Sequence, residues 1–370
     1  MDLRQPKGFV SYFRKARDYD GVFDFVPRAA RPKIGRPEFP VQRRLNFEIG
    51  AGPGRLHVIN DNAGKLFRFS PMTPGGEMLI DVDAANAADA KYAAANNQRP
   101  QPRTAAGPVT TCALAAISQT NMLLLGIHDY GAGRRADPRM ATGRAALYSL
   151  AFMLRRAAAV FLDIQDYELK AGIRSLEDAA GATVTGQIFL CDTLENGAGY
   201  ATHLGSGNVM EELLAMISRP SAREFFDRLM APGHAEVCDT SCPDCLRSYS
   251  NLSYHSLLDW RLGVDMAALA LDANAAISLS SPLWQRVANV AALTLAAARP
   301  GYTTTELAGL PAATNGADVI LVTHPLWHTD SAAQPAELAA ACREAEATRG
   351  MRIDALDSFV SVFEALRRPA

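Results

Sequence analysis

The sequence predicts a mixed α/β protein, with an α+β arrangement left open, and three observations lead to this fold class. Short strand-like runs separated by glycine and proline fill residues 46–82. Helix and strand patterns alternate after residue 143, and three cysteines lie close together between residues 238 and 245. The expected parts are a β-rich N-terminal part, an α/β core with a metal-binding knuckle, and a C-terminal strand–helix segment.

The chain has 370 residues, which is long enough to form two or three lobes. Hydrophobic residues make up 48% and charged residues 21%, which excludes disorder or a coiled coil for the whole chain. The net charge of −2 excludes a uniformly basic nucleic-acid binder but leaves local basic patches open. We expect a basic irregular arm over residues 1–45, a β-rich segment with a flexible excursion over 46–108, an α/β metal-binding region over 109–300 and an α/β segment over 301–370.

The first part is basic and rich in aromatic residues. Residues 1–44 contain eleven Lys or Arg against five Asp or Glu, and aromatic side chains are interleaved with them. The prolines of residues 31–40 interrupt any periodic element, so we expect an irregular arm. Such an arm can hold single-stranded nucleic acid by stacking and phosphate contacts, or it can pack on its own domain or on a partner.

The next stretch has the pattern of β-structure. The runs LNFEIG, RLHVIND and KLFRFS are separated by GAGPG and NAG, and Asn62 and Gly64 give a hairpin signal. GAGPG is not a phosphate-binding glycine loop, because Pro53 and a strand follow where such a loop needs a helix. Residues 83–108, rich in Ala, Asn, Gln and Pro, are expected to form a flexible excursion.

A strand over residues 109–129 leads into a loop rich in glycine and arginine. Arg134, Arg135 and Arg139 in this loop can contact phosphate, and a merely solvated loop is the alternative. The clearest helix covers residues 143–160, where the apolar side chains fall on one face. FLDIQDYELKAGI and GQIFLCDTLENGAGY follow as two strand-like runs with acidic residues at their ends.

The stretch LENGAGY, residues 194–200, indicates a tight turn into a helix. Asn196 and the two glycines suit the turn, and backbone amides from Gly197 to Tyr200 can face a partner or an anion. We therefore expect Asn196 and Tyr200 near a partner or nucleic-acid contact. Helical patterns begin again at residues 208 and 221 and lead to the cysteines.

The chain after the cysteines alternates helices with a buried strand. Leu258, Leu262 and Met266 form an apolar stripe, which predicts a helix that continues to about residue 272. ADVILVTHPLW has the continuous apolar run of a strand covered on both faces. Further helices are expected over residues 283–298, 335–348 and 355–366, which makes this end an α/β segment.

Cys238, Cys242 and Cys245 have C-x3-C-x2-C spacing, with Pro243 in the turn between them. Thiolates at this spacing project toward one point, and His255 offers a fourth ligand. Zinc prefers four tetrahedral S and N donors, and a site filled by protein ligands leaves no position for substrate water. The sequence therefore predicts a structural zinc site. An iron–sulfur cluster and a metal-free set of thiols are the alternatives.

The fourth ligand stays open in the sequence. His255 competes with His234, Cys191 and Cys112, and spacing favours His255.

The sequence lacks a run of about eighteen apolar residues, and its first residues lack the apolar core of a signal peptide. We therefore expect a cytoplasmic protein without a membrane partner. Clustered cysteines in a reducing compartment are metal ligands rather than disulfides.

A metal-dependent nuclease is the alternative function. Glu168 and Lys170 have the E-x-K spacing by which some nucleases hold Mg²⁺ and orient the attacking water. Asp163 lies on the same run, and Asp192 on the next run can complete such a site. His324 and His328 flank a strand end and are expected to be structural.

Three stretches together resemble the zinc-binding C-terminal domain of DEAD/DEAH-box helicases, which includes the MrfA-type repair helicases. They are ALYSLAFMLRRAAAVFLDIQDYELKAG, GQIFLCDTLENGAGYATHL and CDTSCPDCLRSYSNLSYHSLLDWRLGVD. The knuckle, the LENGAGY turn and the LLDWRLG helix are more similar to the DrmB family, the helicase-partner subunits of DISARM anti-phage defence. The resemblance covers about residues 140–370, and the first 80 residues more loosely.

The resemblance implies a metal knuckle of Cys238, Cys242 and Cys245, with His255 at a position where related chains carry a histidine. MrfA-type members complete their site with cysteines alone, whereas this chain has no fourth cysteine nearby.

The sequence has neither a G-x4-GK[ST] loop nor a DEAD-like box, so it lacks the phosphate cradle of a helicase motor. Together with the resemblance, this implies a non-catalytic zinc-binding subunit of bacterial anti-phage defence. Its expected partners are an SF2-type helicase with its own ATP site and, through the complex, DNA.

Overall fold

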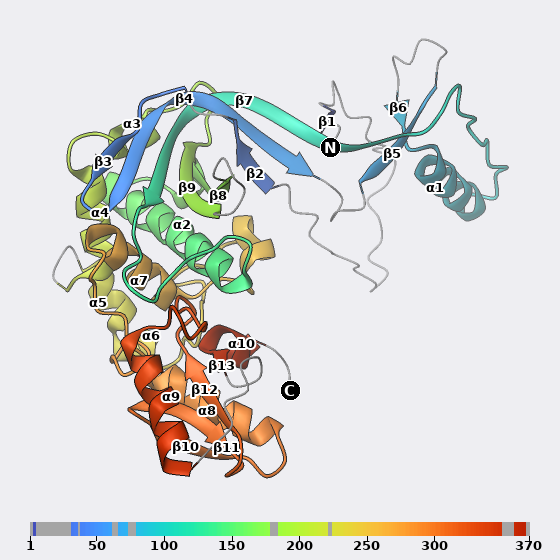
Figure 1. The fold of residues 1–370 in the computed structure, drawn as a ribbon. Helices are drawn as coiled ribbons and strands as arrows, with labels where there is room; N and C mark the ends of the chain where they lie inside the picture. Colours follow the sequence, from blue (N-terminus) through green and yellow to red (C-terminus); the bar gives the residue numbers. More distant parts are fainter. Residues whose placement is uncertain are drawn as a thin grey trace. The chain divides into compact units, whose positions relative to one another are not determined.

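The computed structural model describes residues 3–4, 31–35, 38–60, 66–72, 79–177, 184–220, 224–349 and 359–367 (Figure 1). Most of the expected basic arm and the hairpin turn expected at Asn62 and Gly64 lie outside these residues. Helices alternate with the strands of two sheets, which confirms the α/β fold class.

Contacts divide the chain into two compact units. The first contains residues 1–35 and 55–118, and the second contains residues 36–54 and 119–370. Two long strands, β4 (Phe47–Asn60) and β7 (Thr110–Ile127), contribute residues to both units. Residues 46–54, which the sequence grouped with the β-rich segment, therefore belong to the second unit.

In the first unit, short strands pair with β4 and β7. β2 (Arg31–Ile34) pairs antiparallel with β4, and β1 (Leu3–Arg4) pairs parallel with β7. β5 (Phe67–Pro71) pairs antiparallel with β7 and with β6 (Leu79–Ile80). The prolines of residues 31–40 were expected to exclude regular structure, but β2 is the edge strand of its sheet, where Pro32 is tolerated.

The expected flexible excursion begins with a helix, α1 (Val82–Ala95). Asp81 caps this helix, because its carboxylate accepts the N–H of Ala84 at 2.9 Å. Alanine has the highest helix propensity of all residues, so a composition that suggested flexibility favours a helix here. The residues after α1 have no regular structure before β7, and their flexibility stays a prediction.

In the second unit, the strands form an antiparallel sheet. β3 (Gln42–Arg44) pairs with β4, and β7 pairs with β9 (Val184–Asp192). β9 also pairs along its length with β8 (Leu169–Glu177). β8 and β9 are the two strand-like runs that the sequence predicted.

GAGPG lies inside β4 rather than between two strands, which corrects the predicted break. Gly50, Gly52 and Gly54 alternate along the strand, so their missing side chains share one face. A Cβ atom at Gly50 would lie 2.8 Å from the Pro40 carbonyl oxygen, and one at Gly52 would lie 3.0 Å from Phe39. The glycines let the chain at Phe39 and Pro40 lie against the strand, as expected for a stretch that is no phosphate loop.

Helix α2 (Ala141–Leu162) is the core helix of the second unit, as the sequence predicted. It packs on β8 and β9 and on two helices, α4 (Val209–Ser218) and α7 (Trp260–Leu271) (Figure 1). Its length and mean hydropathy of 1.5 would suffice to cross a membrane, but 78% of its most apolar window is buried inside the protein.

The shorter helices of this region are η1 (Asp166–Glu168), α3 (Tyr200–Leu204), α5 (Phe225–Met230), α6 (Pro232–Ala235) and η2 (Tyr249–Tyr254).

A second sheet forms the C-terminal part of this unit, in the order β10 (Thr303–Leu307), β11 (Leu310–Thr314), β12 (Val319–Thr323) and β13 (Phe359–Ser361). β12 is buried along its whole length, as its apolar run predicted. Helices α8 (Gln285–Ala298) and α9 (Ala336–Arg349) pack on this sheet, and α10 (Val362–Arg367) packs on α8. The described part of the helix expected over residues 355–366 is β13 followed by α10.

The hairpin of β10 and β11 was not predicted. Its two-residue turn consists of Ala308 and Gly309, with φ of 46° and 81°. Positive φ at both positions is the signature of a type I′ turn, which usually carries Asn-Gly. The three threonines that begin β10 were the sequence signal that could have predicted this strand.

Candidate metal centre

The three cysteines lie on an irregular loop between α6 and η2. The N–H of Cys238 donates to the His234 carbonyl at 2.8 Å, which ties the loop to α6. The Cys242 carbonyl accepts N–H groups from Cys245, Leu246 and Arg247 at 3.2, 3.1 and 2.9 Å. These hydrogen bonds close a tight knuckle that presents several side chains on one side.

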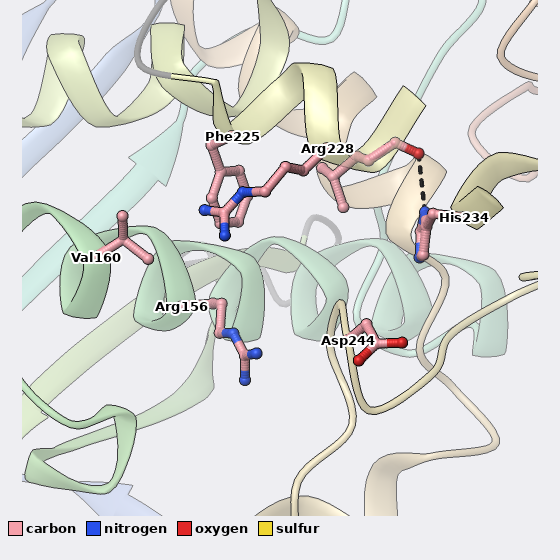
Figure 2. Close-up of a pocket in the computed structure, with 7 residues that line it drawn as sticks. Arg156, Val160, Phe225, Arg228, His234 and Asp244 are labelled. Carbon is pink, nitrogen blue, oxygen red and sulfur yellow. Dashed lines mark hydrogen bonds between the residues drawn. The ribbon is translucent and has the colours of Figure 1, made fainter. Parts of the chain in front are cut away.

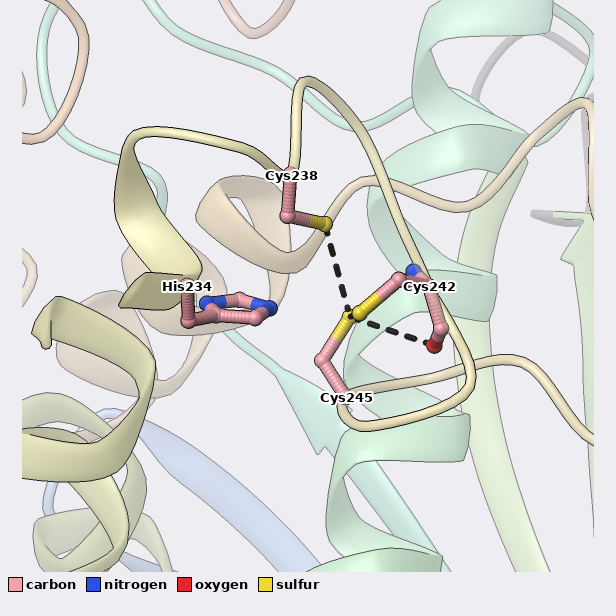
Figure 3. A group of neighbouring side chains, drawn as sticks. All are labelled: His234, Cys238, Cys242 and Cys245. Carbon is pink, nitrogen blue, oxygen red and sulfur yellow. Dashed lines mark hydrogen bonds between the residues drawn. The ribbon is translucent and has the colours of Figure 1, made fainter. Parts of the chain in front are cut away.

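The three thiols converge with the imidazole of His234 (Figure 3). The four ligand atoms all lie within 4.8 Å of one another. Cys245 Sγ lies 3.9 Å from Cys238 Sγ and 3.8 Å from Cys242 Sγ. A tetrahedral site with Zn–S bonds of about 2.3 Å has S–S edges of about 3.8 Å, so the sulfur positions fit zinc.

His234 is oriented for coordination through Nε2. Its Nδ1 lies 2.8 Å from the Leu229 carbonyl oxygen, which can only accept, so Nδ1 carries the proton. Its Nε2 is buried and has no hydrogen-bond partner among the described residues. A metal-ligating histidine commonly donates its second N–H to a carbonyl in this way, which leaves the other nitrogen for the metal.

The three thiols influence one another's pKa through their close contacts. The hydrogen bond from Cys238 lowers the pKa of Cys245 to about 5, and the Cys242 N–H, 3.1 Å from its sulfur, acts in the same direction. The same contact with Cys245 and burial raise the pKa of Cys238, and burial raises that of Cys242. Cys245 is therefore the thiol most readily deprotonated, and zinc binding displaces the thiol protons of its ligands.

His234 replaces His255 in the candidate site. The Nε2 of His255 lies 2.9 Å from the Asn251 side-chain oxygen and 3.1 Å from the Ser248 carbonyl, where it ends η2. Burial lowers the pKa of His255, consistent with a neutral ring in this pocket of hydrogen bonds. Sequence spacing favoured His255 because residues after the cysteines were given more weight. His234, on α6, is four residues before Cys238 and so lies about one helical turn from it.

The two other candidates for fourth ligand lie in strands. Cys191 is buried in β9 opposite Lys170 and Met122, and burial raises its pKa. Cys112 is buried in β7, opposite Phe67.

Two buried side chains at the start of α7 hold the knuckle in place. Trp260 Nε1 and Arg261 Nη2 both donate to the Cys238 carbonyl at 3.2 Å, and Arg261 Nη1 donates to the Asp239 carbonyl at 2.8 Å. The Trp260 ring also meets the edge of the His234 ring at a centroid distance of 5.1 Å. The LDWR stretch therefore forms the support of the metal centre, a role that the sequence did not reveal.

The buried charge of Arg261 is balanced by Asp259, which is also 2% exposed. Arg261 Nη1 lies 3.8 Å from Asp259, and Arg367 from α10 lies 3.1 Å from the other carboxylate oxygen. Burial raises the pKa of Asp259, and the two arginines act against that shift. A buried carboxylate with two cationic partners is satisfied only while both remain in place.

The structure also brings an acidic partner to His324, which the sequence did not show. Asp265 of α7 lies 3.0 Å from His324 Nε2, and it accepts the Trp284 indole N–H at 2.7 Å. His324 Nδ1 accepts the N–H of Leu326 at 3.1 Å. Since His324 and Asp265 are both buried, these bonds join α7, α8 and β12 and support the expected structural role.

The anion bound by the LENGAGY turn is the carboxylate of Asp192 in the same chain. Asp192, fully buried, accepts backbone N–H groups from Ala198, Gly199 and Ala201 at 2.7, 2.7 and 2.9 Å. Two of the amides expected to face a partner, those of Ala198 and Gly199, are therefore already occupied. Tyr200 donates its hydroxyl to Glu168 at 3.1 Å, and Asn196 is exposed in the turn.

The acidic residues of the alternative nuclease site have separate structural roles. Glu168 accepts the Gln165 N–H and the Tyr200 hydroxyl, and Asp192 caps the turn. Lys170 faces Cys191 in the sheet register, and Asp163 ends α2 with a φ of 55°. Within the described residues, the one group of His, Cys, Asp or Glu placed to share a metal is the His234 cluster.

The loop arginines are engaged within the protein. Arg134 Nη1 donates to the Ala275 carbonyl at 2.8 Å, and the Arg135 N–H donates to the Leu326 carbonyl at 2.8 Å. Arg139 forms an ion pair with Asp137 at 2.7 Å. Arg134 and Arg135 thus hold the loop to the segments that follow α7 and β12, Arg135 through its backbone alone, and the Arg139 pair lies within the loop. The phosphate contact stays a prediction.

Comparisons with known proteins give three matches, and one of them covers this centre. The family model described as the MrfA Zn-binding domain matches residues 150–246. The Druantia protein DruE of Escherichia coli (strain UMEA 4076-1) is 35% identical over 128 residues, which are 34% of this chain and 6% of DruE. The chain therefore spans only a small part of that relative.

The comparison with solved structures matches one described as the DUF1998 helicase MrfA bound to DNA. It shares 12% identity and a TM-score of 0.35, over 60% of this chain and 23% of MrfA. The matched family region begins in α2 and ends one residue after Cys245, so it contains the knuckle, His234 and the helix that lies beneath them. The donor set, its spacing and this match identify a structural zinc site.

Proposed function

We propose that this chain is a non-catalytic zinc module that works beside a DNA helicase in bacterial anti-phage defence. The observation that carries the proposal is the match of residues 150–246 to the MrfA Zn-binding domain, at the place where four zinc-type ligands converge. The similarity of 128 residues to DruE of the Druantia system supports a defence role.

The zinc ligands in this proposal are His234, Cys238, Cys242 and Cys245. Four protein ligands fill the tetrahedron, so the metal stabilises the fold and does not activate water. Hydrogen bonds from neighbouring residues orient these ligands. The Leu229 carbonyl holds the His234 ring, and Trp260 and Arg261 hold the Cys238 carbonyl.

The proposed partner is an SF2-type helicase that supplies the ATP site. The sequence has no G-x4-GK[ST] loop, and its one glycine-rich candidate, GAGPG, is a strand. A phosphate cradle needs a loop followed by a helix, so ATP hydrolysis must come from another polypeptide or domain. DNA would be engaged through that complex, and a DrmB-like role in DISARM is the most specific form of the proposal.

Co-expression with the products of neighbouring genes tests this function. We expect a tagged chain to co-purify with a protein that carries a phosphate-loop motif, and the complex to hydrolyse ATP when DNA is present. The chain alone should show no ATPase activity above that of a variant with residues 50–54 replaced by alanine. ATPase activity of the isolated chain that this replacement abolishes would contradict the proposal.

A further inference from the structure

A pocket of about 350 Å³ lies beside the zinc centre and is not used by the function proposed above. Its walls come from α2, α5, α6 and the knuckle loop, and His234 is one of the residues that line it (Figure 2). Arg156 of α2, Arg228 of α5 and Asp244 of the knuckle are the ionised side chains that line it. Counted without the zinc centre, these three side chains leave one positive charge in excess, and zinc held by three thiolates would add one negative charge nearby.

Both arginines are available to a ligand. Arg156 is half-buried and Arg228 is exposed, and neither forms an ion pair with a carboxylate of the described residues. By contrast, Arg155, Arg261 and Arg367 each have a carboxylate partner. Two unpaired guanidinium groups at one concave site are what distinguishes this pocket.

The two arginines are also held on rigid elements. Arg156 projects from the core helix α2, and the Arg228 guanidinium carbon lies 5.6 Å from the centre of the Phe225 ring. Phe225 is itself buried, so its ring gives Arg228 a fixed surface to lie against. A preorganised guanidinium loses less conformational freedom when it binds an anion.

We propose that this pocket binds a phosphate group, carried by a nucleic-acid strand or by a free nucleotide. Guanidinium groups match phosphate geometry with paired N–H donors, and two of them can neutralise one phosphate from two sides. The volume is within the range of pockets that hold small ligands. This inference deepens the proposed function, on which it rests for DNA as the biological source of the phosphate.

Asp244 favours a nucleotide over an acidic peptide. A peptide segment rich in carboxylates would bring further negative charge toward Asp244, with a repulsive result. A nucleotide combines its phosphate with donors, the sugar hydroxyl or base amino groups, that a carboxylate can accept. The pocket therefore offers complementary groups to both parts of a nucleotide.

The test compares two double variants of the full-length zinc-loaded chain. Arg156→Gln with Arg228→Gln removes the pocket charges, and Arg219→Gln with Arg343→Gln removes two exposed arginines elsewhere. Fluorescence anisotropy with a labelled single-stranded oligodeoxynucleotide, at several salt concentrations, gives the affinity and its salt dependence. Competition with AMP, inorganic phosphate and poly-glutamate identifies the chemical source. Zinc content and circular dichroism confirm that each variant is folded.

We expect the pocket variant to lose affinity about tenfold or more, and the slope of log Kd against log salt to fall by about 0.7, the value of one phosphate contact on a single strand. The control variant should stay close to wild type. If AMP displaces the labelled oligodeoxynucleotide, the pocket recognises the phosphate group itself. If the oligodeoxynucleotide binds and AMP does not displace it, the phosphate comes from a nucleic-acid strand. Equal losses in the two double variants, no binding of any phosphate probe, or tighter binding of poly-glutamate would overturn the inference.

Asp244→Asn should change the affinity for phosphate in the opposite direction. A misfolded variant would not gain affinity. The substitution removes the negative charge from the pocket, so the affinity for inorganic phosphate should rise several-fold, and an unchanged or weaker affinity would count against the site. Co-purification with the helicase and zinc content test the proposed function separately. A pocket variant that keeps both and binds phosphate probes as wild type does would remove this inference alone.

Discussion

His234 and His255 are a matched pair of residues for testing the metal ligands, since both were candidates and the structure places only His234 with the thiols. His234→Ala should lower zinc affinity by more than the roughly 10- to 100-fold that is lost when a residue hydrogen-bonded to a metal ligand is replaced. His255→Ala should leave zinc bound, because its ring contacts Ser248 and Asn251 instead.

Zinc per chain, measured by elemental analysis after dialysis against a weak chelator, separates the two variants. Zinc lost from His255→Ala and retained by His234→Ala would restore the ligand that spacing favoured.

Arg261 supports the knuckle from a buried position, and Arg286 contacts the same stretch from the surface. Arg261→Met should lower the free energy of unfolding by about 3–5 kcal/mol, because it leaves Asp259 buried with one cation fewer. Arg286→Met removes an ion pair with Asp239 in which both side chains are substantially exposed, and should cost at most about 0.5 kcal/mol. Urea denaturation of both variants measures the difference, and similar small losses would show that Arg261 does not support the fold.

At the scale of elements, the turn before α3 depends on the carboxylate of Asp192. Asp192→Asn keeps the size of the side chain but loses one acceptor oxygen and the charge, so at least one of three backbone N–H groups is left unsatisfied. We expect a loss of about 1–3 kcal/mol in the free energy of unfolding. Glu195→Gln, at an exposed position of the same turn, is the control and should change stability little. A shift in thermal midpoint for the control alone would contradict this assignment.

The hairpin of β10 and β11 carries alanine where its turn favours asparagine. Ala308 has a φ of 46°, a conformation that asparagine adopts more readily than alanine. Ala308→Asn should therefore raise the free energy of unfolding by about 0.5–1 kcal/mol. Gly309→Ala, at a φ of 81°, should lower it, and thermal denaturation of the two variants gives the comparison. The same direction of change in both would argue against a type I′ turn.

For the whole molecule, the metal should hold the second unit together. Elemental analysis should find about one zinc and no iron per chain, because the four ligands suit a closed tetrahedral site. Removal of zinc with a strong chelator should lower the thermal midpoint and expose apolar surface to a dye, since binding of structural zinc contributes directly to folding. Restored zinc should reverse both changes. An unaltered midpoint in chain shown to be metal-free would mean that the knuckle folds without its ion.

The sequence predicted those features that depend on neighbouring residues. Helix α2 and strands β7 and β12 follow from local periodicity, and the knuckle follows from cysteine spacing. Helix α1 was missed because an alanine-rich composition was interpreted without its cap at Asp81.

What the sequence could not provide are partners that meet across long separations. Asp265 and His324 are 59 residues apart in the chain, and no local sequence pattern predicts their contact. The same holds for Arg155, which pairs with Asp166 and reaches the Ser248 hydroxyl, 93 residues away. His234 was near enough to consider, yet the choice between two histidines needed the orientation of α6 and the hydrogen bond from Nδ1.

Helix α7 is held at two places that lie only five residues apart, about 7.5 Å along its axis. Trp260 is bonded to the Cys238 carbonyl, and Asp265 is bonded to Trp284 and His324. A pull on the C-terminal sheet is therefore transmitted to the knuckle through little more than one turn of helix. In a force experiment with handles on residues 119 and 367, the C-terminal sheet and the knuckle should rupture in one event, at a force that drops when zinc is absent.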